Sequence, residues 1–155
     1  MSNLLVEQHD KLVIEMANFY LDNMEKELGK KYVDNSHEVN ASLSDAQYKE
    51  LKAKYDIDDF EFADLYAEFQ KMKPTKHLKS ALDAFAASGG NVDIEPIFDE
   101  KQQRLNVSVS FAIKDKTYET IEGLSALEQI ILKMNAMIQI DNVLSGADPE
   151  VEPTF

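Results

Sequence analysis

The chain has no cysteine, and only one of its 16 basic residues, Arg104, is an arginine. Without cysteine it forms no disulfide, has no thiol nucleophile and cannot hold zinc or an iron–sulfur cluster through thiolates. Arginine is the usual side chain for bidentate phosphate recognition, so its near absence disfavours phosphate ligands. No stretch approaches the roughly 18 consecutive apolar residues of a membrane-spanning helix. The first residues also lack the basic and apolar regions of a signal peptide, so we expect a cytoplasmic protein.

Acidic residues are abundant instead. The chain of 155 residues has 29 Asp and Glu against 16 Lys and Arg, and its formal net charge is -13 at pH 7. A field of this sign repels nucleic acid and anionic membranes and attracts basic protein surfaces. The hydrophobic content of 44% is sufficient for a folded core, so the acidity does not indicate global disorder. We therefore expect a protein partner with a basic surface, and neither direct nucleic-acid binding nor membrane binding.

Helical periodicity and capping patterns predict five helices, at about residues 3–28, 44–55, 58–73, 75–87 and 125–144. Ser44 with Gln47 and Ser125 with Glu128 form capping boxes, which are typical of helix starts. Gly29 follows the last apolar position of the first helix, where a left-handed C-cap residue is expected.

Alternation of apolar and polar residues predicts three strands, at residues 91–98, 105–113 and 117–122. Short turns join these strands, so we expect an antiparallel meander, and Pro96 places the first strand at an edge. The predicted fold class is α+β: a three-stranded antiparallel β-meander packed against about five helices, including long N- and C-terminal helices. Residues 1–146 are expected to form a single globular domain.

The sequence contains no recognisable catalytic or metal-binding motif. The three histidines, His9, His37 and His77, lie in separate segments, and none belongs to a His-Glu-x-x-His pattern. The acidic run at residues 56–61 does not match a calcium-binding loop, because Glu61 and Ala67 occupy the glycine and bidentate glutamate positions. We therefore predict no catalytic residue, no metal, no cofactor and no enzymatic activity. An enzyme that uses dispersed carboxylates or histidines is a further hypothesis, although no motif locates its site.

Many helical acids lie off the apolar stripes and could form an extended negative surface. The candidate partner-binding residues are Asp56, Asp58, Asp59, Glu61, Asp64 and Glu68. Such a surface can imitate the phosphate array of a duplex and occupy a nucleic-acid-binding groove. The sequence thus predicts a non-enzymatic acidic interaction protein, which could act as an inhibitor of a nucleic-acid-handling enzyme. The alternative is a structural or assembly module, or an accessory subunit, that acts as a helix-mediated homodimer, because the stripes on the first and last helices are broader than one sheet face requires.

Residues 147–155 form an acidic, proline-containing tail that is predicted to be disordered. The tail resembles the docking tails of bacterial single-stranded-DNA-binding proteins, which recruit enzymes by placing a terminal aromatic ring in a pocket beside basic residues. On this resemblance, Glu150, Glu152 and Phe155 are candidate docking residues, and the alternative is an inert solvating tail. It covers only the last eight or nine residues, and the helix-rich body departs from that family, which is built on an OB barrel.

Overall fold

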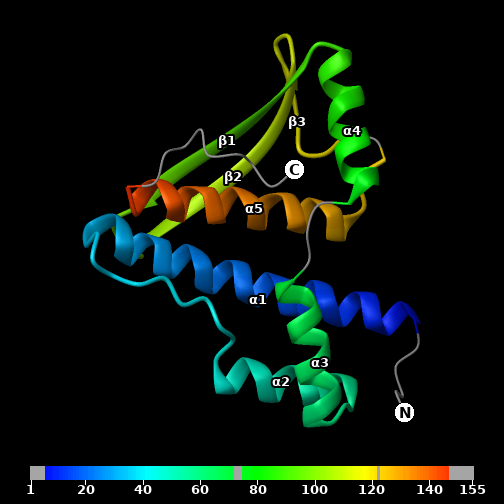
Figure 1. Ribbon diagram of the computed structural model, residues 1–155, viewed down its shortest axis with the longest axis vertical. Helices are drawn as coiled ribbons and strands as arrows, with labels where there is room; N and C mark the ends of the chain where they lie inside the picture. Colours follow the sequence, from blue (N-terminus) through cyan, green and yellow to red (C-terminus); the bar gives the residue numbers. More distant parts are fainter. Residues whose placement is uncertain (1–5, 72–74, 122, 147–155) are drawn as a thin grey trace.

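The computed structural model describes residues 6–71, 75–121 and 123–146 (Figure 1). Its helices are α1 (Val6–Val33), α2 (Asp45–Tyr55), α3 (Asp59–Gln70), α4 (Lys76–Ala87) and α5 (Ala126–Leu144). Its strands are β1 (Gly90–Asp99), β2 (Arg104–Ile113) and β3 (Lys116–Tyr118), which form one antiparallel sheet in the order β1-β2-β3. These described elements confirm the predicted α+β class, and none of the helices is long and apolar enough to cross a membrane.

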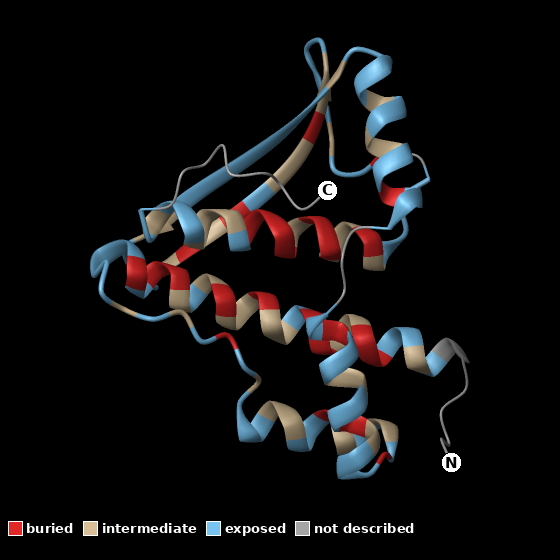
Figure 2. Ribbon diagram, in the orientation of Figure 1, coloured by how far each residue is buried: buried red, intermediate tan, exposed pale blue. Residues whose placement is uncertain are grey.

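The long helices α1 and α5 lie side by side, and both contact β2 (Figure 1). The short helices α2 and α3 pack on the other side of α1, so α1 is the central element. Buried residues follow α1, α5 and β2, whereas β1 is exposed along most of its length (Figure 2). The fully buried side chains of this main core include Leu12, Met16, Leu28, Phe62, Phe69 and Met137.

A second, smaller cluster attaches α4 to the sheet. Phe111, Ile121 and Leu132 are buried there, and the Phe85 ring of α4 meets the Phe111 ring edge-on at 5.7 Å between centroids. A Cβ on Gly90 would lie 2.4 Å from the Phe85 ring, so any other residue there would force the ring to move. The strand β3 ends at Tyr118 rather than near residue 122, and Ile121, beyond its end, is buried in this cluster.

The capping patterns are confirmed at the starts of α2 and α5. Ser44 and Ser125 each accept a hydrogen bond from the backbone N–H three residues later, and Gln47 and Glu128 complete the two capping boxes. Thr75 caps α4 in the same way, through the N–H of Leu78. Side-chain oxygens thus satisfy N–H groups that a helix start leaves without a partner.

The predicted C-cap at Gly29 is wrong, because α1 continues through this residue to Val33. Gly29 is buried, and a Cβ there would lie 2.3 Å from the carbonyl oxygen of Gln103 and 2.5 Å from the Cα of Arg104. The glycine therefore allows the backbone of α1 to pass close to the start of β2. The predicted start of this helix, at residue 3, lies outside the described residues.

Candidate interaction surface

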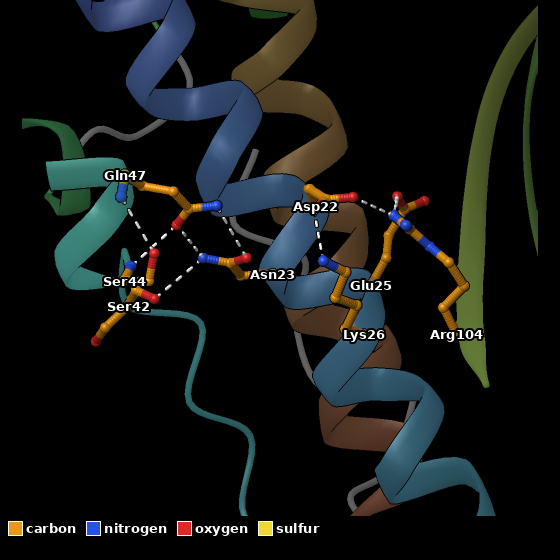
Figure 3. Close-up of polar contacts among 8 residues, drawn as sticks. All are labelled: Asp22, Asn23, Glu25, Lys26, Ser42, Ser44, Gln47 and Arg104. Atoms are coloured by element: carbon orange, nitrogen blue, oxygen red, sulfur yellow. Dashed lines mark hydrogen bonds and ion pairs between the residues drawn. The ribbon is translucent and has the colours of Figure 1, made fainter. Parts of the chain in front are cut away.

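One side of α1 holds the loop that leads into α2 (Figure 3). The amide Nδ2 of Asn23 donates to the carbonyl oxygen of Ser42 at 3.1 Å and to Oε1 of Gln47 at 2.9 Å. The same Gln47 oxygen accepts from the backbone N–H of Ser44, which completes the capping box of α2. Asn23 thus ties the start of α2 to α1, and Glu15 of α1 holds the end of α2 by accepting hydrogen bonds from Lys54 and Tyr55.

The opposite side of α1 holds the start of β2 through the only arginine (Figure 3). Nη2 of Arg104 donates to Oδ1 of Asp22 at 2.6 Å and to Oε1 of Glu25 at 2.8 Å, and the other Glu25 oxygen accepts from the backbone N–H of Val107 at 2.9 Å. Burial raises the pKa of Asp22, but the hydrogen bonds from Arg104 and Lys26 outweigh this effect and lower it. The guanidinium is therefore engaged in ion pairs within the fold.

The candidate acids Asp56, Asp58 and Asp59 lie at the α2–α3 corner, where each has a structural role. Asp56 ends α2 in the left-handed conformation, with φ of 51°, and Asp58 caps α3 by accepting from the N–H of Glu61 at 2.8 Å. Asp59 pairs with Lys52, whose hydrogen bond lowers the pKa of Asp59, while the same bond raises the pKa of Lys52. Helix ends and a local ion pair therefore account for part of the acidic run.

The remaining candidates lie further along α3. Glu61 is half-buried, whereas Asp64 and Glu68 are exposed four residues apart, so they lie on one face of the helix. The six candidates thus occupy one continuous segment. Asp64 and Glu68 have no structural role comparable to that of the capping aspartate, and they are the acids best suited to meet a partner.

Sequence reasoning missed Phe60, the most exposed of the large hydrophobic side chains in the described chain, at 87%. It lies between Asp59 and Glu61 in the first turn of α3. The helical phase contained a signal for it, because Phe62 and Phe69 are fully buried on the inner stripe and Phe60 falls off that stripe. An exposed aromatic ring among carboxylates can bury apolar area in a partner while the acids meet its basic rim.

A second polar cluster joins α4 to α5. Nδ1 of His77 lies 2.9 Å from Oε2 of Glu128, which also accepts from the Thr75 hydroxyl, while Oε1 of Glu128 accepts from the Ser125 N–H. The hydrogen bond with His77 is the largest cause that lowers the pKa of Glu128, to about 2. Both oxygens of this carboxylate accept hydrogen bonds, and the cluster thereby joins the starts of α4 and α5.

A cleft of about 660 Å³ lies between α1, β2 and α5, and its charged lining residues are Glu25, Glu119 and Lys133. Both oxygens of Glu25 already accept hydrogen bonds, from Arg104 and from the Val107 N–H. No histidine lines the cleft, and no group of three metal-ligating side chains is found among the described residues. The predicted tail residues Glu150, Glu152 and Phe155 lie outside the described part of the chain.

No protein-family model matches the chain, and neither a curated protein nor a solved structure is similar to it. The assignment of function therefore depends on the surfaces described above.

Proposed function

We propose that the protein is a non-enzymatic acidic interaction protein that presents its α2–α3 corner to a basic partner. In its specific form, the proposal is that it inhibits a nucleic-acid-handling enzyme by occupying the groove that binds phosphates. The observation that carries the proposal is the exposed ring of Phe60 within a segment of carboxylates.

The surrounding charges support this proposal. The net charge of -13 attracts a basic partner over a distance, which raises the rate of association. Exposed carboxylates at Asp64 and Glu68 supply local negative charge beside the apolar ring of Phe60. Buried aromatic anchors surrounded by charged rims are typical of the residues that dominate binding energy at interfaces.

The test is affinity capture from nuclease-treated lysate followed by competition with duplex DNA. A partner that elutes with rising salt and is displaced by the duplex would support the mimic, because both ligands would then occupy one basic groove. A partner that binds duplex and protein at the same time would contradict the inhibitor form of the proposal.

A pair of charge-matched variants locates the surface. The double variant Asp64→Lys and Glu68→Lys should weaken binding of the captured enzyme by about tenfold or more, because like charges then meet across the interface. Glu38→Lys with Asp83→Lys changes the net charge equally at exposed positions on a loop and on α4, and should weaken binding much less. Equal losses in the two variants would indicate that only the overall charge acts, and would remove the corner from the proposal.

The alternative proposal is an assembly module that forms a homodimer. Exposed Tyr32 and Val143, near the ends of α1 and α5, favour it, since they are 52% and 49% exposed. Analytical ultracentrifugation separates the two proposals: a dimer that persists at high salt, with no enzyme captured, would favour assembly.

A further inference from the structure

The strand β1 lies at an open edge of the sheet. It pairs only with β2, and no other described strand lies beyond it. It is ten residues long, and seven consecutive residues of it, from Asn91 to Ile97, are exposed. A strand of this length with an open edge presents a row of backbone donors and acceptors to solvent.

The hydrogen-bond pattern shows which backbone groups point outward. The Val107 N–H donates to the Glu25 side chain, so it points away from β1. Val107 and its partner Pro96 are therefore a non-hydrogen-bonded pair of the β1–β2 ladder. The N–H and C=O groups of successive residues point alternately toward β2 and toward the open edge. The backbone groups of Val92, Ile94 and Phe98 therefore point to the open edge, as does the C=O of Pro96. Proline has no N–H to offer, which makes the open edge the position where it is tolerated.

One face of β1 is apolar. Val92 and Ile94 pair with Phe111 and Val109, so their side chains share the face that the helices cover over β2, yet they are 39% and 36% exposed. Further along this face is an apolar groove of about 330 Å³. The groove is lined by Tyr32, Pro96, Phe98, Leu105, Ile140, Val143 and Leu144.

The other face of β1 carries two exposed acids, with exposed Ile97 beyond them. Asp93 and Glu95 are both exposed there, and they pair with Ser110 and Ser108 of β2. No lysine or arginine lies on β1 to balance them. An added strand would therefore meet carboxylates on one face and apolar side chains on the other.

We propose that the open edge of β1 binds an extended segment of a partner protein, in which apolar residues alternate with lysine or arginine, as an added strand. Backbone hydrogen bonds to the outward groups of Val92, Ile94 and Phe98 supply the pairing, as in other cases of strand addition. The apolar side chains of the segment extend the apolar face, and its basic side chains lie opposite Asp93 and Glu95, where opposite charges stabilise cross-strand pairs.

The same charges disfavour a second copy of this chain. In antiparallel pairings of β1 with itself centred on Asp93, Ile94 or Glu95, an acid lies directly opposite an acid, which is destabilising. The open edge is thus better suited to a basic segment than to self-association, and this inference does not depend on the function proposed for the α2–α3 corner.

The probe is a capped peptide of alternating valine and lysine, ten residues long like β1. Amide hydrogen exchange is followed by NMR on the full chain, with peptide up to about 1 mM. We expect exchange at Val92, Ile94 and Phe98 to slow by about tenfold or more, with little change at Asp93 and Glu95, whose N–H groups already bond to β2. Two control peptides should fail: one with N-methyl groups on the edge-facing amides, and one with glutamate in place of lysine.

Two variants of the protein sharpen the test. Ile94→Pro removes an outward N–H and should abolish protection by the peptide, whereas Ile94→Val should keep it, and both should leave the β1–β2 ladder intact. Asp93→Lys with Glu95→Lys should reverse the preference, so that the valine–glutamate peptide binds at least about tenfold more tightly than the valine–lysine peptide.

Three results would overturn the proposal: no slowing at the outward amides, equal protection by the N-methylated peptide, or protection of those amides without peptide in a dimer seen by ultracentrifugation. The last result would assign the edge to a second copy. None of them bears on capture of an enzyme by the α2–α3 corner, so the two proposals fail independently.

Discussion

Replacing Gly29 with alanine tests the close packing of α1 against β2, because two effects of opposite sign compete there. Alanine is a better helix former than glycine by about 1 kcal/mol, so an unobstructed helical site would be stabilised. At Gly29, however, the new Cβ would lie 2.3 Å from the Gln103 carbonyl oxygen and 2.8 Å from its carbonyl carbon. Relief requires a shift of backbone, not of a flexible side chain, and Arg104 ties that backbone to α1 through Asp22 and Glu25.

Overpacking of a well-packed site costs about 1 to 3 kcal/mol, and more where the backbone is held. We therefore expect Gly29→Ala to lower the free energy of unfolding by about 2 kcal/mol net, and the Tm by about 4 to 8 °C for a chain of this size. Urea denaturation with a fixed m value measures the change. Ala53→Gly, at an exposed position inside α2, calibrates the propensity contribution and should cost about 1 kcal/mol. A Gly29→Ala protein as stable as the parent, or more stable, would refute the packing argument.

Three other predictions follow from single contacts. Phe60→Ala should weaken binding of the captured partner by about 30-fold, which an affinity titration measures. Because the ring is 87% exposed, the same change should alter the free energy of unfolding by less than about 0.5 kcal/mol in a urea titration. The pKa of Glu128 is lowered from 4.5 to about 2, chiefly by the hydrogen bond with His77 and further by hydrogen bonds from Ser125 and Thr75. The stabilisation from these bonds, about 2 kcal/mol, should be complete above pH 4.5 and lost as the pH falls toward 2, and Glu128→Gln should flatten this part of the pH–stability curve. Lys31, only 7% exposed, pairs with Asp141 at 2.5 Å. Asp141→Ala leaves the buried ammonium without its carboxylate, so it should lower the free energy of unfolding more than Lys31→Met does. Equal losses of stability in urea titrations would contradict this reasoning.

Local signals were sufficient for most of the fold. Ser44 and Ser125 marked two helix starts because capping depends on residues only three positions apart. Strict alternation marked β2, since one of its faces is covered by helices and the other is not. The error at Gly29 has a different origin: glycine is common at helix ends, and only the approach of Gln103, distant in sequence, shows that this glycine serves close packing within a helix.

The candidate surface was predictable in place but not in detail. The sequence located the acidic segment, but it could not separate the acids that hold the corner together, such as Asp58 and Asp59, from exposed Asp64 and Glu68. Cap geometry and the ion pair with Lys52 require coordinates. The composition argument against phosphate ligands stays a prediction. The structure adds that the single arginine, Arg104, is hydrogen-bonded to two carboxylates of α1, a contact 79 and 82 residues away in sequence that composition could not reveal.

The open edge of β1 shows how a distant contact can decide what a local pattern means. Pro96 predicted an edge strand, but alternation alone could not say which N–H groups point outward, because a shift of one residue exchanges the outward and inward sets. The hydrogen bond from the Val107 N–H to Glu25, 82 residues away in sequence, settles this alternation. With this alternation, the backbone of Pro96, which has no N–H, faces the open edge, and the N–H groups of Asp93 and Glu95 bond to β2. Since their backbone N–H groups bond to β2, Asp93 and Glu95 can act on an added strand only through their side-chain carboxylates. Like charges there disfavour a second copy of β1, and opposite charges favour a basic strand.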